Sequence, residues 1–167
     1  MRVLLVVGFL LALAGCGQTM SADEKANSDA SDVAYVEAVQ DRHPPVETIA
    51  PQPITFTDIE AHDLFGAGCY ILVGDAEEMV FLGDDVRGAI KLDGEIVGFA
   101  ADTGSPELPY ASRERYTGKA YWVELHKADV EGTPYGEESI RWPGTIAIYD
   151  RWERPIYSAK GTLECGA

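Results

Sequence analysis

The chain has 167 residues, and its 28 acidic side chains against 13 lysines and arginines give a formal net charge of −15. This length suffices for one folded domain and is short for two. Such acidity argues against a nucleic-acid partner and against a domain that lies flat on anionic lipid, because like charges repel. The charge fits a solvated surface or a basic partner.

The first residues have the order of an export signal. Arg2 precedes an apolar run at residues 3–13, and small residues follow the run. The run has about half of the ~20 apolar residues that span a bilayer. The motif Leu13-Ala14-Gly15-Cys16 resembles the lipobox of bacterial lipoproteins. The resemblance implies cleavage before Cys16 and palmitate-containing lipid on that residue; an ordinary secretion signal cut near Ala22 is the alternative.

The residue after the lipobox bears on the choice of membrane. Gly17 stands where an Asp would resemble the inner-membrane retention signal of enteric bacteria. Its absence favours the outer membrane, with the domain facing the periplasm. Stable anchoring requires more than one acyl chain, and a triacylated Cys16 supplies them. We therefore expect a lipid-anchored protein of the cell envelope.

Two cysteines remain besides Cys16. Cys69 and Cys165 form an even pair in an oxidising compartment, which predicts a disulfide. The loop that they close, about 97 residues, is long enough for on the order of 4 to 5 kcal/mol of stabilisation. No CxxC motif or nearby histidine supports a metal site at these cysteines.

The composition predicts three segments: a signal peptide at residues 1–15, a tether at 16–52 and a β domain at 53–167. The tether is rich in Ser, Ala, Asp, Glu and Pro, which is typical of flexible chain with a reach of roughly 30 to 35 Å. Residues 32–39 have apolar side chains at helical spacing after Ser31, which predicts either a transient helical turn or two or a short helix that docks on the domain or on a partner.

From residue 53 onward, short runs of β-forming residues alternate with turn residues. The predicted strands are 54–57, 69–73, 79–82, 89–92, 95–99, 119–125, 144–149 and 156–165. Asp93-Gly94 predicts a type I′ hairpin, and residues 58–64 favour a turn. Seven to eight short strands without a strong amphipathic helix indicate an all-β fold, a small antiparallel barrel or sandwich. Both Cys69 and Cys165 fall on apolar strand faces, which supports the disulfide.

No specific catalytic motif is present, and we predict no metal and no cofactor. The sequence lacks GxSxG, HExxH, a Walker loop and a dinucleotide-binding glycine motif. Glu60, His62 and Asp63 form either a polar turn or part of a metal site. Glu124 and His126 share a strand face and are expected to be an exposed charge pair.

Aromatic and basic residues are frequent in the second half of the β region. The aromatic residues are Tyr116, Tyr121, Trp122, Trp142, Tyr149, Trp152 and Tyr157. The basic residues among them are Arg113, Arg115, Arg141, Arg151 and Arg154. Either the aromatic side chains fill the core while the arginines pair with acids, or Trp and Arg form a surface that binds a protein or a sugar.

The polar segment 150–155 predicts an exposed turn between the last two strands, because Pro155 removes a ladder donor. Arg151, Trp152 and Arg154 on that turn are our candidate binding residues. We interpret the chain as a non-enzymatic envelope lipoprotein whose β domain binds a protein, for which the net charge favours a basic one, or a glycan.

Two further functions remain open. In outline the chain resembles the small β lipoproteins that inhibit lysozyme, which carry a Cys near each end of the domain. Residues 117–122, TGKAYW, are loosely similar to the inhibitory loop of that family but lack its Ser-Gly start. Another alternative is a hydrolase whose site assembles from scattered histidines and carboxylates. A structural component of an envelope complex would instead expose a large apolar patch.

Overall fold

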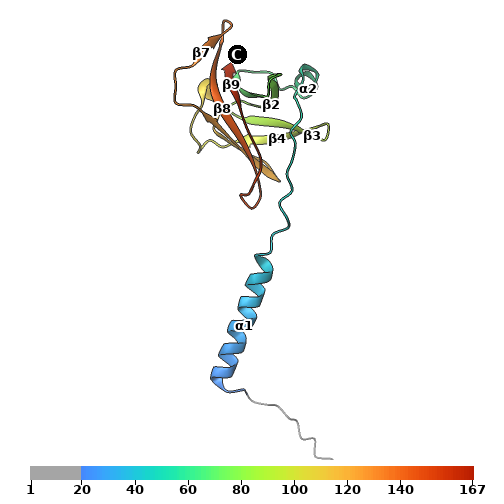
Figure 1. Ribbon diagram of the computed structural model, residues 1–167, viewed down its shortest axis with the longest axis vertical. Helices are drawn as coiled ribbons and strands as arrows, with labels where there is room; N and C mark the ends of the chain where they lie inside the picture. The colour runs from blue at the N-terminus through green and yellow to red at the C-terminus, as the bar shows by residue number, and fades with distance from the viewer. Residues whose placement is uncertain (1–19) are drawn as a thin grey trace, which may run out of the picture. The chain divides into compact units, whose positions relative to one another are not determined.

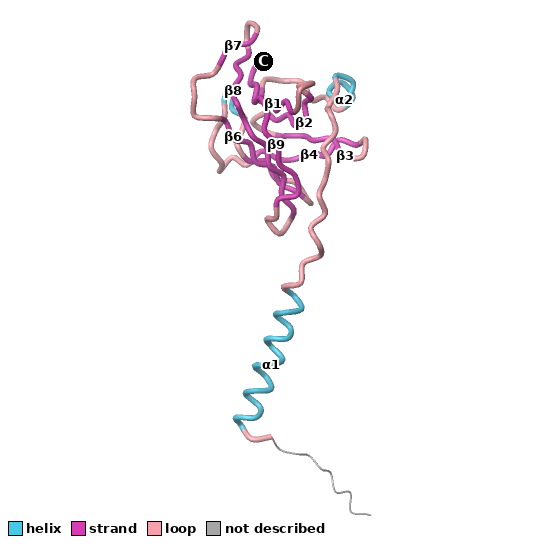
Figure 2. The backbone as a smooth tube through the Cα atoms, viewed as in Figure 1, coloured by secondary structure: helices cyan, strands magenta, loops and turns pink. Residues whose placement is uncertain are grey.

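The structure is a computed structural model that describes residues 20–167 (Figures 1 and 2). The lipobox with Cys16 lies outside the described residues. The chain divides into two compact units, Met1–Pro44 and Pro45–Ala167. None of the helices in the described part has the length and hydropathy of a membrane span.

The first unit contains a single long helix among its described residues, α1 (Ala22–Gln40). The helix begins at a capping box, in which the Ser21 hydroxyl accepts the Glu24 amide at 3.2 Å and the Glu24 carboxylate accepts the Ser21 amide at 2.9 Å. The sequence predicted only a short helix at 32–39. The helix is longer because this cap and the recurring alanines favour helix from residue 22 onward. No residue of α1 is buried.

The second unit is an antiparallel β barrel. The strands hydrogen-bond in the order β6-β5-β4-β3-β2-β1-β9-β8-β7, and an additional β6–β8 pairing closes eight of the nine into a barrel. The extra strand, β7, extends the sheet beside the first part of β8. The strands are β1 (Gly68–Val73), β2 (Glu78–Gly83), β3 (Arg87–Leu92), β4 (Glu95–Ala101), β5 (Arg115–Thr117), β6 (Tyr121–Lys127), β7 (Thr133–Tyr135), β8 (Ser139–Asp150) and β9 (Pro155–Gly166). The predicted all-β antiparallel fold is confirmed.

Side chains fill the interior of the barrel. The largest fully buried ones are Tyr116, Phe81, Ile71, Ile90, Leu125, Ile146, Ile148 and Leu163. They come from strands on every side, as period-two alternation places them. A small barrel packed in this way has a solid core. A ligand of this domain must therefore bind on the outer surface or at the rim.

The predicted hairpin is present between β3 and β4. Asp93 and Gly94 have positive φ values of 49° and 84°, the conformation that both central residues of a type I′ turn adopt. The register continues from Leu92↔Glu95 to Arg87↔Ala100.

One predicted strand was wrong, because residues 54–57 lead into a helix. Thr55 and Asp58 form a capping box at the start of α2 (Phe56–Ala61). The Lys91 ammonium then donates to the Asp58 carboxylate at 2.7 and 2.9 Å. This ion pair and the hydrogen bonds from Thr55 lower the pKa of Asp58. Ile54 is buried and its amide donates to Met79 O at 2.7 Å, so the segment packs along the barrel without becoming a strand.

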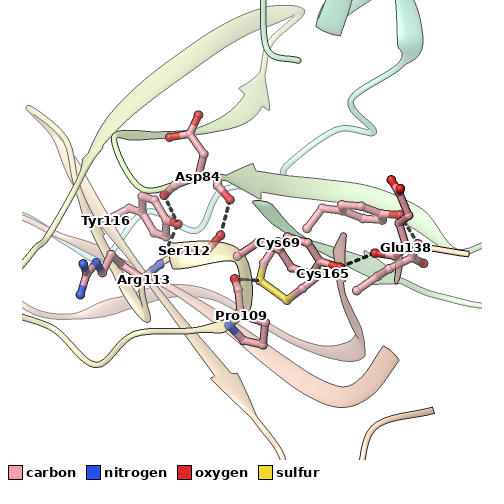
Figure 3. The surroundings of a disulfide bond; sticks show 12 residues. Cys69, Asp84, Pro109, Ser112, Arg113, Tyr116, Glu138 and Cys165 are labelled. Carbon is pink, nitrogen blue, oxygen red and sulfur yellow. Dashed lines mark hydrogen bonds between the residues drawn. A yellow bond between two sulfur atoms is a disulfide. The ribbon is translucent and has the colours of Figure 1, made fainter. Parts of the chain in front are cut away.

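Cys69 and Cys165 form the predicted disulfide, and both are buried. They lie directly opposite each other in the β1–β9 register, with Cα atoms 4.0 Å apart. Beside them the loop that contains η1 (Pro109–Ala111) lies over the disulfide (Figure 3). The Pro109 carbonyl oxygen is 3.4 Å from Cys69 Sγ.

Buried polar groups hold this loop in place. The Ser112 hydroxyl donates to Gly83 O at 2.9 Å, and the Tyr116 hydroxyl donates to Asp84 O at 2.8 Å. The Arg113 amide donates in turn to the Tyr116 oxygen at 3.0 Å. Burial raises the pKa of Tyr116, so its hydroxyl stays protonated and keeps donating. Figure 3 shows these contacts beside the disulfide.

Candidate binding surface

The turn between β8 and β9 lies where the sequence predicted it, at residues 151–154. Arg151 is exposed, and Trp152 keeps 36% of its surface accessible. The Arg154 side chain is less accessible, at 23%. All three predicted binding residues therefore lie together at one rim of the barrel.

Asp150 organises this turn. Its carboxylate accepts the Trp152 and Arg154 amides at 2.9 and 3.0 Å. The Arg154 guanidinium donates to the same carboxylate, with Nε at 2.8 Å and Nη2 at 2.7 Å. Burial alone would raise the pKa of Asp150, but the hydrogen bonds from Arg154 and the Trp152 amide outweigh it and lower that pKa. Asp150 is thus an anion that fixes the shape of the turn.

The Trp152 indole has two cationic neighbours. The guanidinium carbon of Arg154 is 4.8 Å from the ring centroid, and that of Arg151 is 5.4 Å away. Both distances fall within the range of cation–π contacts. Arg151 has no ion-pair partner in the described part of the chain, so its donors remain available. A rigid indole flanked by guanidinium groups is typical of binding hot spots.

A second aromatic and basic group, the outer ladder, crosses three strands on the outside of the barrel. Its members are Arg115 on β5, Trp122 on β6 and Tyr149 on β8. The Trp122 and Tyr149 rings stack with centroids 3.9 Å apart and planes 6° apart. The Arg115 guanidinium lies 4.3 Å from the Trp122 centroid. Because β6 lies between β5 and β8, both faces of the indole are covered, and Trp122 offers no open face to a sugar.

The remaining aromatic residues belong mainly to the core. Tyr116 and Trp142 are buried, and Tyr121 and Tyr157 are partly buried against the core cluster. The core interpretation therefore holds for these four residues, whereas the Trp152 ring is exposed. Within this sequence cluster, Trp152 has an exposed ring with two cationic neighbours at a turn.

His126 and Glu124 lie side by side on β6. His126 Nε2 lies 3.5 Å from the Glu124 carboxylate, which also contacts Arg115 at 3.5 Å. The predicted charge pair on β6 is present; His126 is exposed, whereas Glu124 is only partly exposed. Glu60 lies in α2, and His62 is its C-cap residue. Glu60, His62, Glu124 and His126 line neither of the two pockets described below. Across residues 20–167, no group of three or more His, Cys, Asp or Glu side chains could hold a metal ion.

Residues 117–122 form the turn that joins β5 to β6. The Gly118 amide donates to Tyr121 O at 2.8 Å, and Lys119 is exposed at the tip. Tyr121 pairs with Asp150 across β6 and β8. The β5–β6 turn and the β8–β9 turn are therefore neighbours at the same rim. Neither a protein-family model, a curated protein nor a solved structure matches this chain.

Proposed function

We propose that this protein is a non-enzymatic lipoprotein of the bacterial cell envelope, anchored through lipid on Cys16, whose barrel binds a protein or a glycan. The observation that carries the binding proposal is the exposed Trp152 between Arg151 and Arg154 at the barrel rim. The filled interior supports it, because an outer surface is then where recognition must occur. The lipobox motif supports the anchor and the envelope location, the outer membrane in particular.

The anchor has a direct test. Cys16→Ser is expected to abolish incorporation of labelled palmitate and to block lipoprotein-specific cleavage, because the thiol is the acyl acceptor. The measurement is palmitate labelling of the full chain in cells, followed by a high-salt wash of the membranes. Labelled Cys16→Ser protein that stays in the washed membranes would refute the anchor.

The binding face is tested by Trp152→Ala. We expect the melting temperature to change little and partner capture to fall at least tenfold, about 1.4 kcal/mol. Capture is measured by crosslinking in intact cells with quantitative mass spectrometry, and by pull-down of isolated envelope glycan. Val130→Ala, which also removes exposed apolar surface, is the control and should leave capture unchanged.

Two outcomes would contradict this binding face. A Trp152→Ala protein that loses several kcal/mol of unfolding free energy would place the indole among the stabilising core contacts. Unchanged capture by a stable Trp152→Ala protein would place the binding surface elsewhere on the barrel.

A second candidate function is inhibition of a basic envelope enzyme such as lysozyme. The favouring observation is that the loop similar to that of the inhibitor family forms an exposed turn with Lys119 at its tip, beside the β8–β9 turn. The discriminating assay adds the purified protein to lysozyme and follows lysis of bacterial cell walls. Inhibition that Lys119→Ala abolishes would favour this function over general binding.

A further inference from the structure

Two pockets adjoin each other on the outside of the barrel, at the end of β8 opposite the β8–β9 turn. The first has a volume of about 200 Å³, and the second about 310 Å³. Ser139, which lines both pockets, is the first residue of β8. Asp150, which precedes the β8–β9 turn, is the last residue of the same strand. The pockets are therefore distinct from the surface around Trp152.

The first pocket is mainly apolar. Its apolar side chains are those of Ile59, Leu64, Phe65, Met79 and Leu82. Ligand pockets for drug-sized molecules typically measure about 300 to 1,000 Å³, so this one suits a single apolar side chain and is too small for an acyl chain. At its mouth Phe65 is 53% exposed and meets the 69% exposed Phe56 edge to face, with ring centroids 6.0 Å apart. These rings extend the apolar surface outward.

The second pocket is acidic. Glu137, Glu138 and Glu164 line it, together with Tyr135. Arg141 Nε donates to the Glu164 carboxylate at 2.6 Å and so balances its charge. The guanidinium carbon of Arg141 lies 3.4 Å from the Tyr135 ring centroid. Glu137 and Glu138 are exposed and have no ion-pair partner within residues 20–167. Their charge is the part of the pocket that a basic ligand group would meet.

We propose that the paired pockets bind an extended segment of a basic partner protein, with a Leu or Phe side chain in the first pocket and an Arg or Lys in the second. The linings of the two pockets share Ser139 and Ala167, so the pockets adjoin. Residues i and i+2 of an extended chain share a face, so the probes place one residue between the two side chains. The carboxylates repel phosphate-bearing lipids and anionic glycans. The net charge of −15 attracts a basic protein to this acidic surface.

The test uses the full lipid-anchored chain in nanodiscs and two synthetic probes, acetyl-Leu-Gly-Arg-amide and acetyl-Arg-Gly-Leu-amide. Saturation-transfer NMR detects binding through the peptide's own signals, and empty nanodiscs provide the blank. At least one probe is expected to show saturable transfer to its Leu methyl groups. Acetyl-Leu-Gly-Glu-amide is expected to show none, because the acidic pocket repels its carboxylate.

Two variants locate the binding. Glu137→Gln with Glu138→Gln removes the unpaired charges, and Ala67→Trp fills the apolar pocket from its exposed wall. Each is expected to weaken binding of the probe at least fivefold. The control pair, Glu95→Gln with Glu131→Gln, removes two exposed acids that line neither pocket and should change nothing.

The result that would overturn the proposal is equal transfer to the Leu-Gly-Glu peptide, or no saturable transfer to either basic probe. Unchanged binding in both pocket variants would overturn it as well. Trp152→Ala should leave the probe affinity unchanged, since that residue lies beyond the other end of β8. Partner capture by Trp152→Ala therefore tests the binding face around Trp152, and transfer to the peptide probes tests the paired pockets.

Discussion

Replacing both Cys69 and Cys165 with alanine is expected to lower the free energy of unfolding by about 4 to 5 kcal/mol. The disulfide joins residues 96 positions apart and fastens the first barrel strand, β1, to the last, β9. Without it, the unfolded chain gains the conformational freedom of a long open loop. Urea denaturation followed by tryptophan fluorescence measures the loss.

The reduced wild-type protein is the control for this variant. Reduction removes the covalent link but keeps the sulfur atoms, so it isolates the crosslink from the packing that alanine also loses. Folded, oxidised protein should show no thiol in titration of the barrel, because both cysteines are paired and buried. A double variant that loses less than about 1 kcal/mol would show that the loop-entropy argument does not apply here.

Strand faces could be predicted because a strand has a two-residue period. Cys69 and Ile71 on β1, and Leu163 and Cys165 on β9, are buried on the face that the alternation assigned to the core. The register that places the two cysteines opposite each other comes from the pairing of β1 with β9, which the period alone does not fix. The hairpin at Asp93 followed from the preference of Asp-Gly for positive φ. The strand faces and the hairpin depend on a few neighbouring residues, and a single sequence contains that information.

The sequence pattern missed two strands because they are short, and other features because they depend on contacts far along the chain. The short strands β5 and β7 have only three residues each, too few for a recognisable alternation. The choice of barrel over sandwich depends on the pairing of β6 with β8, which no local pattern specifies. Residues 54–57 read as a strand because they are β-branched and aromatic, but the Thr55–Asp58 cap and the Lys91 ion pair stabilise a helix.

The candidate site also has a part that the sequence could predict and a part that it could not. The turn with Trp152 was predictable, since polar residues and Pro155 mark it locally. The two pockets were not, because they combine the segment before β1 with the start of β8. The outer ladder also needed the register that places Trp122 opposite Tyr149. The pockets and the outer ladder therefore depend on strand pairing, whereas the Trp152 turn depends on a local sequence pattern.

Replacing Arg141 with Met is expected to cost about 3 to 5 kcal/mol of unfolding free energy, because it leaves a buried carboxylate without its cation. Glu164 is only 3% exposed. It accepts Arg141 Nε at 2.6 Å and also accepts the Tyr70 hydroxyl. Burial and the adjacent Glu164 carboxylate raise the pKa of Tyr70, so its hydroxyl remains a donor. One neutral donor cannot replace the guanidinium.

The double variant Arg141→Met with Glu164→Gln separates the unpaired charge from lost packing. A Gln amide at position 164 carries no charge and can still accept from Tyr70, so the double variant should be more stable than Arg141→Met alone. Tyr135→Leu controls for the ring that lies on the guanidinium. Urea denaturation of the wild type, Arg141→Met, Glu164→Gln and the double variant at neutral pH gives the coupling energy. If Arg141→Met lost no more than the double variant, solvent would be stabilising the Glu164 charge, and the ion pair would contribute little to the fold.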